Sequence, residues 1–246
     1  MVSKLELFNK DKKTGKEKFC GQFEIKNEAE YSELFIYGDI MSYKWDDSDV
    51  VPQDIADFLK ELDGKAKLNI YINSGGGSVF AGLAIYNQLK RHAAEKTVYV
   101  DGLAASIASV IAMCGSKLVI PSNAFLMIHK AWSWTMGNST DFRKAADDLE
   151  RIDEGILNVY KENLAEGVDI DTVKELVNAE TWLTGEEAAK YFNVEVDETN
   201  KAAACVSEYF DEYKNAPKGF LAEFKPPNAP NNDFEKQQLL LQIDLI

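Results

Sequence analysis

The chain has 246 residues, 46% of them apolar, and a formal charge of −14 from 41 acidic and 27 basic side chains. The composition is typical of a globular protein, and the acidic balance argues against nucleic-acid binding, because phosphate contacts need a basic surface. No apolar run reaches the roughly 18 residues of a membrane-spanning helix, and the charged start lacks a signal-peptide core. We therefore expect a cytoplasmic protein whose three widely spaced cysteines are free thiols.

The first 32 residues are charged and weakly patterned, so we expect an N-terminal arm with short accessory strands over 1–32. From residue 33, short apolar runs alternate with stretches of helical spacing, which predicts an α/β domain over 33–199 with a largely parallel sheet. The strand patterns lie at 34–38, 67–72, 97–102, 117–121 and 125–129. The helical patterns lie at 51–64, 79–94, 105–115, 139–166, 171–178 and from Thr184, where Thr-Gly-Glu-Glu forms a capping box.

The regular patterning weakens after about residue 200, so we assign residues 200–246 to a C-terminal extension. Its segment KPPNAPNND has three prolines and three asparagines and is typical of a linker. The segment QQLLLQIDLI is a short apolar tip. This tip is compatible with an element docked on its own domain, with a partner-binding segment and with disorder.

The glycine-rich turn INSGGGSVFAG at 72–82 joins a predicted strand to a predicted helix. Three glycines allow positive φ angles, and their N–H groups lie near a helix N-terminus, where negative charge is stabilised. The turn lacks the lysine of the phosphate-binding G-x-x-x-x-G-K-[ST] motif and the register of G-x-G-x-x-G. It is either a plain tight turn or a source of N–H donors for an oxyanion hole.

Three side chains are candidates for catalysis. Ser106 stands where a predicted strand meets a helix of small residues, so it is either a helix cap or a nucleophile. His129 ends an apolar strand and is either structural or a general base, whereas His92 lies in a polar stretch. Glu180 is either a surface carboxylate or the group that orients a base. Together these residue types suit a serine–histidine–carboxylate mechanism, which tolerates any order along the chain.

The motifs INSGGGSVFAGLAIYNQL, DGLAASIAS, FLMIH and ETWLTGEEA, in this order, resemble the Clp protease family, in its ClpP-like branch of phage and prophage head-maturation (prohead) proteases. The resemblance covers about residues 33–197. It implies a ClpP/crotonase-like fold, in which ββα units form a spiral and a handle of one helix and one strand protrudes. It also implies a homo-oligomeric ring and a serine endopeptidase that works through an acyl-enzyme, without a metal or a cofactor.

The resemblance also assigns roles to single residues. It places the nucleophile at Ser106, the general base at His129 and the orienting carboxylate at Glu180, where the cellular family has Asp. The backbone N–H groups of Gly77 and Ile107 fall on the oxyanion hole. The peptide substrate is expected as an added strand between the segment after the glycine turn and the segment after the histidine, at Ser78, Val79, Lys130, Ala131 and Trp132.

Several positions depart from the cellular pattern. Gly75 stands where cellular members have Pro, and Ile107 stands where they usually have Met, but both positions contribute through the backbone. Glu180 is one methylene longer than Asp, so Asp153 and Asp197 remain open as alternative third members of the triad.

The resemblance leads to the hypothesis of a prohead-type endopeptidase that cleaves scaffold or capsid-protein segments in the host cytoplasm or inside the capsid precursor. The sequence Gly-Asn-Ser-Thr at 137–140, ahead of a long helix, resembles that branch. One alternative is a catalytically inactive ClpP-like structural or scaffolding protein of capsid assembly, which the change to Glu180 permits. Another alternative is a crotonase-like enzyme acting on acyl-CoA. We expect protein partners, and neither nucleic acid nor membrane.

Overall fold

The computed structural model describes residues 2–10, 17–26, 31–44, 49–62, 67–198, 207 and 212–217, with residues 2–26 described by their backbone alone. The chain divides into two compact units, Met1–Asn215 and Ala216–Ile246. All described elements belong to the first unit. The predicted linker and apolar tip lie outside the described residues.

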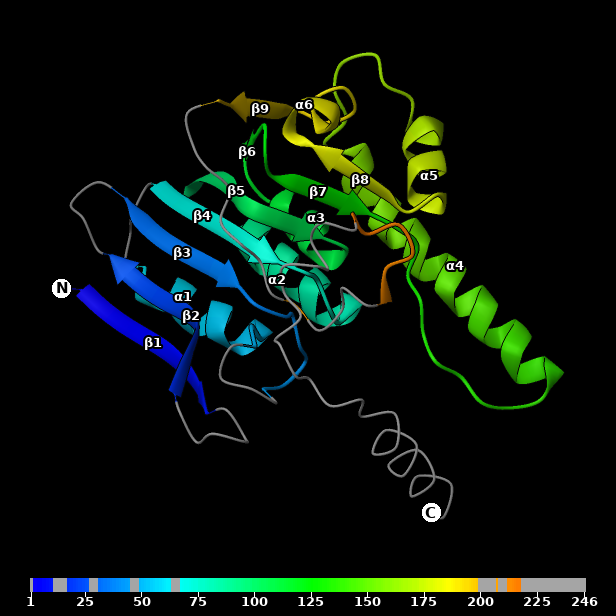
Figure 1. Ribbon diagram of the computed structural model, residues 1–246, viewed down its shortest axis with the longest axis horizontal. Helices are drawn as coiled ribbons and strands as arrows, with labels where there is room; N and C mark the ends of the chain where they lie inside the picture. Colours follow the sequence, from blue (N-terminus) through cyan, green and yellow to red (C-terminus); the bar gives the residue numbers. More distant parts are fainter. Residues whose placement is uncertain are drawn as a thin grey trace. The chain divides into compact units, whose positions relative to one another are not determined.

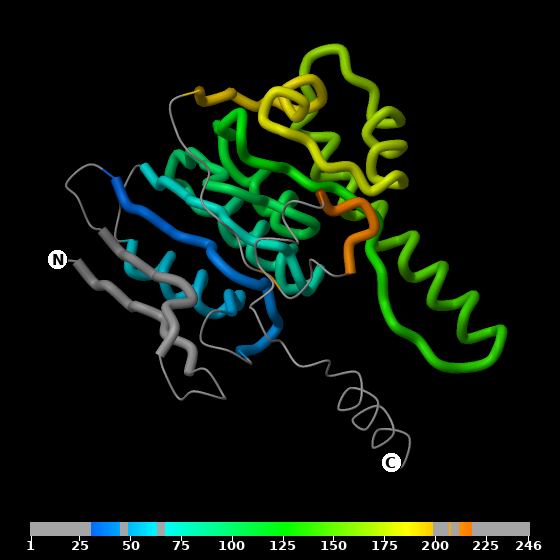
Figure 2. Tube along the Cα trace, in the orientation of Figure 1, coloured from blue at the N-terminus to red at the C-terminus, as the bar shows by residue number. Residues whose placement is uncertain are grey.

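The described strands form a two-stranded and a seven-stranded sheet (Figures 1 and 2). β1 (Val2–Lys10) and β2 (Glu17–Lys26) pair in antiparallel fashion within the predicted N-terminal arm. The main path of the larger sheet is parallel throughout, in the order β3 (Ser32–Tyr37), β4 (Lys67–Ser74), β5 (Glu95–Ala105), β6 (Lys117–Pro121) and β9 (Val194–Asp197).

Two further strands branch from this path. β7 (Phe125–Ile128) pairs in parallel with the end of β5, and β8 (Thr181–Thr184) pairs with β7 in antiparallel fashion. Because β5 is eleven residues long, it pairs with β6 near its start and with β7 near its end. β5 therefore runs from the middle of the sheet to the edge that holds the carboxyl ends of the parallel strands.

Helices α1 (Pro52–Glu61), α2 (Val79–Arg91) and α3 (Ile107–Ala112) lie side by side behind the sheet in Figure 1. Their apolar faces cover the strands and form the core. All six residues of α3 are buried, which explains its small and apolar composition. The core side chains contributed by the two central strands include Leu68, Ile70, Ile72, Val98 and Val100.

The C-terminal helices are α4 (Ser139–Lys161), α5 (Ile170–Asn178) and α6 (Gly185–Ala188). The side chain of Asn138 caps α4 by accepting hydrogen bonds from the N–H groups of its first turn. The second half of α4 packs on the core, whereas its first half is largely exposed and projects away from the sheet (Figure 1). This projecting half corresponds to the expected handle helix.

The predicted α/β fold with a largely parallel sheet is confirmed. Several helix boundaries differ from the sequence prediction. The helix predicted at 105–115 begins only at Ile107, because Ser106 has a positive φ of 54° that no helix accommodates. The helix predicted at 139–166 ends at Lys161, because the following residues bridge to the loop before β9. The four-residue strands β8 and β9 were not predicted.

Candidate active site

The candidate catalytic segments meet at the edge of the sheet where β4, β5 and β7 end. β4 pairs with β5, and β5 with β7, in parallel in both cases, so the three carboxyl ends share one edge. The glycine turn at 75–77 follows β4, Ser106 follows β5 and His129 follows β7. The carboxyl edge of parallel strands is the usual place of ligand sites in α/β sheets.

Ser106 has a strained backbone conformation, with φ 54° and ψ −126°. Residues other than glycine rarely adopt a positive φ, and they keep it only where the surrounding structure enforces it. Here the Ser106 N–H donates to the Met127 carbonyl (2.9 Å), and the Ser106 carbonyl accepts from the Ser109 N–H (3.0 Å). These bonds fix a sharp strand-to-helix turn that presents the serine hydroxyl to a pocket, as a nucleophile requires.

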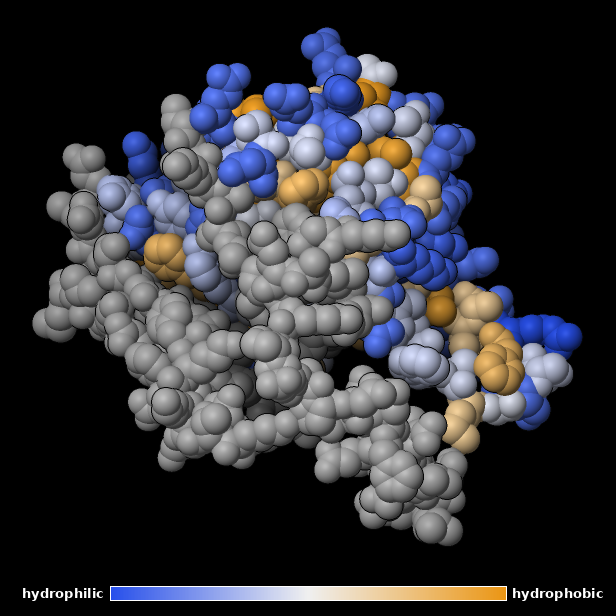
Figure 3. All heavy atoms as spheres, viewed as in Figure 1, coloured by the Kyte–Doolittle hydropathy of each residue, from blue (hydrophilic) through white to orange (hydrophobic). Residues whose placement is uncertain are grey.

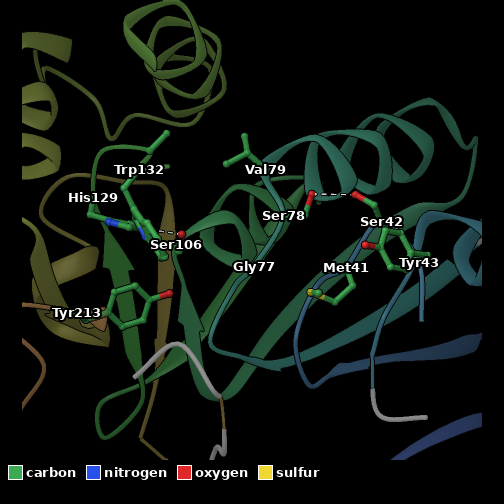
Figure 4. Close-up of a pocket in the computed structure, with 11 residues that line it drawn as sticks. Met41, Ser42, Tyr43, Gly77, Ser78, Val79, Ser106, His129, Trp132 and Tyr213 are labelled. Atoms are coloured by element: carbon green, nitrogen blue, oxygen red, sulfur yellow. Dashed lines mark hydrogen bonds between the residues drawn. The ribbon is translucent and has the colours of Figure 1, made fainter. Parts of the chain in front are cut away.

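The imidazole of His129 meets that hydroxyl, with Nε2 2.7 Å from Ser106 Oγ (Figure 4). At this distance a base takes a proton directly. Burial lowers the pKa of His129 from its ordinary value of 6.5, and the charges of Glu180 and Asp153 raise it by smaller amounts. Because the net shift is downward, the imidazole is largely neutral at pH 7 and its Nε2 accepts a proton.

The glycine turn approaches Ser106 so closely that it excludes side chains. Gly76 and Gly77 have φ 102° and 139°, a region that favours glycine. A Cβ on Gly76 would lie 2.7 Å from Ser106 Cβ, and one on Gly77 would lie 2.1 Å from the Ile40 carbonyl oxygen. Any larger residue at either position would push the turn away from the serine.

The N–H groups of Gly77 and Ile107 are available as donors. A parallel bridge forms around Ile40, whose N–H donates to the Gly76 carbonyl and whose carbonyl accepts from the Ser78 N–H, both at 2.7 Å. In such a bridge the N–H of the central residue, here Gly77, faces away from the bridge partner. Ile107 is the first residue of α3, so its N–H has no acceptor within the helix. The oxyanion-hole role of these two N–H groups stays a prediction.

A pocket of about 310 Å³ lies in front of Ser106 and His129 (Figure 4). The two predicted substrate segments border it from opposite sides, one at the start of α2 and one after β7, through Ser78, Val79, Ala131 and Trp132. The predicted contact residue Lys130 does not border the pocket. Its ammonium group instead lies 3.4 Å from Asp153 Oδ2.

Four residues that line the pocket were not predicted. Met41, Ser42 and Tyr43 lie between β3 and α1, and Tyr213 lies in the C-terminal extension. The first three belong to a loop without a motif, and Tyr213 lies beyond the predicted protease domain. Since no local pattern marks these positions, only the fold reveals them.

The carboxylate of Glu180 binds the backbone of the C-terminal extension. Its Oε1 accepts a hydrogen bond from the Asn215 N–H (2.6 Å), and its Oε2 accepts one from the Lys214 N–H (3.1 Å). Glu180 itself has a φ of 52°, the second positive value outside glycine in the described part of the chain. The charge of Glu180, the predicted orienting residue, therefore raises the pKa of His129, but its carboxylate hydrogen-bonds the extension and not the imidazole.

The two alternative carboxylates lie in different surroundings. Asp153 on α4 accepts a hydrogen bond from the Ala131 N–H at 2.8 Å through Oδ1. Asp197 ends β9, and its charge contributes to a raised pKa of Lys117. Within the described residues, neither Glu180 nor Asp153 hydrogen-bonds the imidazole, and both act on it through charge.

Among the described residues, no group of three His, Cys, Asp or Glu side chains is placed to hold a metal ion. No helix in that part of the chain combines the length and apolar content of a membrane span. Cys114 is a free, buried thiol, and burial raises its pKa to about 12. The other two cysteines lie outside the residues with described side chains.

Known proteins resemble this chain over more than half of its length. The profile of the Clp protease family matches residues 27–195. The ATP-dependent Clp protease proteolytic subunit of Ligilactobacillus salivarius is 34% identical over 137 residues, which make up 54% of this chain and 68% of that protein. The protein of the same name from Bacteroides fragilis is 29% identical over 137 residues, or 54% of this chain and 65% of that protein. Since the family profile spans well over half of its length, the chain belongs to the Clp protease family.

Proposed function

We propose that this chain is a serine endopeptidase with Ser106 as nucleophile and His129 as general base. The observation that carries the proposal is the 2.7 Å separation between His129 Nε2 and Ser106 Oγ beside a pocket. The strained turn at Ser106 and the downward shift of the His129 pKa support it. Membership of the Clp protease family supports the same reaction class.

The geometry suggests the following steps. Ser106 Oγ attacks the carbonyl carbon of the peptide while its proton moves to His129 Nε2. The N–H groups of Gly77 and Ile107 donate to the oxyanion, and loss of one such donor typically costs roughly 10²–10³ in rate. His129 then protonates the leaving amine, the C–N bond breaks and an acyl-enzyme remains. Water attacks the acyl carbon and gives a proton to His129, which passes it to Ser106 Oγ as the acyl C–O bond breaks and the acid product leaves.

We assign the role of the carboxylate that stabilises the His129 imidazolium to Glu180, with a contribution from Asp153. The negative charge of each raises the pKa of His129, which means that each favours the imidazolium that forms during the reaction. Glu180 also occupies the position at which the resemblance places the carboxylate.

We assign the substrate to the scaffold or capsid proteins of a phage-type head, cleaved by a homo-oligomeric ring in the host cytoplasm or inside the capsid precursor. The support is the likeness of residues 137–140 to the prohead branch. The peptide would add as a strand between residues 78–79 and 130–132, which border or adjoin the pocket. Backbone pairing of that kind makes cleavage tolerant of sequence.

A second candidate function is that of an inactive structural subunit in capsid assembly. The observation that favours it is the engagement of the Glu180 carboxylate by two backbone N–H groups of the extension in place of the imidazole.

A fluorophosphonate probe distinguishes the two functions. We expect the purified chain to be labelled at Ser106, as mapped by mass spectrometry of the labelled peptide. Ser106→Ala should abolish both labelling and peptide cleavage while the protein stays folded. Ser122→Ala, at an exposed serine outside the pocket, is the matched control and should label like the wild type. A folded and assembled wild type that takes up no probe would favour the structural role.

A further inference from the structure

The C-terminal extension reaches the active-site pocket through Tyr213. This side chain is only 7% exposed and borders the pocket beside Ser106 and His129. It lies beyond residues 27–195, which the profile of the Clp protease family matches. The family assignment therefore does not account for its place in the site.

Tyr213 contacts both the candidate base, beside which it lies in Figure 4, and the glycine turn. Its ring makes a T-shaped contact with the His129 imidazole, with 5.3 Å between the centroids and 79° between the planes. It makes a similar contact with Trp182 on β8, at 5.8 Å and 72°. Its hydroxyl donates a hydrogen bond to the Gly75 carbonyl. Tyr213 thus contacts both His129 and the glycine turn, whose relative positions the proposed reaction requires to be fixed.

Four hydrogen bonds hold the segment around Tyr213 at the turn before β8. The Glu180 carboxylate accepts from the N–H groups of Lys214 (3.1 Å) and Asn215 (2.6 Å). The Asn215 side-chain amide donates to the carbonyls of Ala179 (2.8 Å) and Glu180 (3.0 Å). Bonds from backbone N–H groups to a carboxylate are stronger than neutral ones, so Glu180 is the main anchor of the segment.

A second contact of the extension depends on the glycine at position 75. Ser207 Oγ donates to Asp39 Oδ1 at 2.6 Å. A Cβ on Gly75 would lie 2.1 Å from the same Ser207 oxygen, so a side chain at this position would collide with the extension. The glycine turn therefore provides the space that Ser207 fills, next to the carbonyl that Tyr213 binds.

We propose that Tyr213 is a positioning residue for His129 and for the glycine turn, and that Glu180 also serves the base by anchoring the segment that carries Tyr213. The inference rests on the proposed function, because it assigns roles within the same site. The ring limits rotation of the imidazole away from Ser106 and excludes water from that side. The hydroxyl holds the Gly75 carbonyl two residues before the Gly77 donor.

The test compares Tyr213→Phe and Tyr213→Ala in the full chain, with Tyr191→Phe as a matched control outside the pocket. One readout is the second-order rate of fluorophosphonate labelling as a function of pH. The other is the titration of His129 by NMR, assigned with the variant His92→Gln. Circular dichroism and thermal unfolding establish that each variant is folded, and Tyr213→Leu replaces the alanine variant if that one does not fold.

Tyr213→Phe keeps the ring and loses the bond to Gly75, so labelling should slow by roughly two- to tenfold with an unchanged pKa of His129. Tyr213→Ala removes the ring as well, and a displaced base should slow labelling by roughly 10²-fold. Burial lowers the pKa of His129, so exposing the imidazole raises it, and the pH of half-maximal labelling rises with it. The other titratable groups that act on His129, Glu180 and Asp153, are present in every variant.

A folded Tyr213→Ala protein with the labelling rate and the His129 titration of the wild type would overturn the proposal. Equal slowing by Tyr191→Phe would overturn it too, because the effect would then be general destabilisation. If the wild type is not labelled at all, the proposed catalytic function fails, but the NMR titration still tests the contact. A pKa of His129 that rises in Tyr213→Ala would then support the positioning role, and an unmoved pKa would reject it.

Discussion

The carboxylate of Glu180 acts on two parts of the structure, the imidazole of His129 and the backbone of the C-terminal extension. Its charge raises the pKa of His129, and its oxygens accept from the N–H groups of Lys214 and Asn215. In a serine–histidine–aspartate triad the carboxylate hydrogen-bonds the imidazole and fixes its tautomer. The additional methylene of a glutamate extends its reach to the extension's backbone. At position 180, where the cellular family has Asp, the longer Glu thus hydrogen-bonds the C-terminal extension.

The charge of Glu180 can be tested against that of Asp153. Glu180→Gln removes the charge and replaces one of the two accepting oxygens by an NH2 group, so it keeps only one of the bonds from Lys214 and Asn215. We expect kcat/KM for peptide cleavage to fall by about tenfold, equivalent to a change of about one pKa unit in imidazolium stabilisation. That loss is much smaller than the loss expected from Ser106→Ala. Asp153→Asn should have a smaller effect, and a damaging Asp153→Asn beside a silent Glu180→Gln would make Asp153 the third member.

The glycine turn, the serine and the histidine of the site are predictable from sequence because each directly follows a strand. The glycine turn, Ser106 and His129 each follow a recognisable apolar strand, and the parallel pairing of these strands brings their ends together. The partners of Glu180 are different. They lie 34 and 35 residues further along the chain, in a segment without periodicity, so no local pattern links them to residue 180.

At the scale of elements, the glycine turn lies close to the start of α3, which is the arrangement that the proposed oxyanion hole requires. The prediction of a helix here was correct in kind because the segment is apolar and composed of small residues. Its start was wrong because the positive φ of Ser106 is a property of tertiary contacts and has no signal in the residue type. β8 and β9 were missed because TWLT and VEVD hold only two apolar residues each, whereas the equally short β7 is a continuous apolar run.

The turn can be tested with Gly77→Ala. The new Cβ would lie 2.1 Å from the Ile40 carbonyl oxygen at φ 139°, so the turn must shift and its N–H donor with it. We expect fluorophosphonate labelling to slow by roughly 10²–10³-fold. Gly155→Ala on α4 is the matched control, because its Cβ has no neighbour within 4 Å.

The control should be more stable by about 1 kcal/mol, the preference of a helix for alanine over glycine, and should label at the wild-type rate. Thermal unfolding of both variants separates loss of the donor from loss of the fold. A Gly77→Ala protein that labels as fast as the wild type would remove Gly77 from the oxyanion hole.

At the scale of the whole molecule, apolar side chains are exposed around the start of α4 (Figure 3). Trp134 is 85% exposed, Met136 82% and Phe142 51%. Large apolar side chains gathered on a surface mark an interaction site. The same handle is linked to the pocket, because Asp153 on α4 accepts from the Ala131 N–H on the pocket wall. In the proposed homo-oligomeric ring, we expect subunit contacts at the handle to support the proposed substrate segment after His129.

Trp134→Ser combined with Met136→Ser tests this inference. Because both side chains are exposed in the single chain, the double variant should fold normally, yet it should lose apolar contact area between subunits. Light scattering coupled to size exclusion should show a smaller assembly than the wild type, and fluorophosphonate labelling should slow, since the loop that carries Ala131 loses support. Phe80→Ser on α2, at a side chain that is 70% exposed, is the matched control and should change neither mass nor rate. A double variant that keeps the mass of the wild type would place the subunit contacts outside the handle.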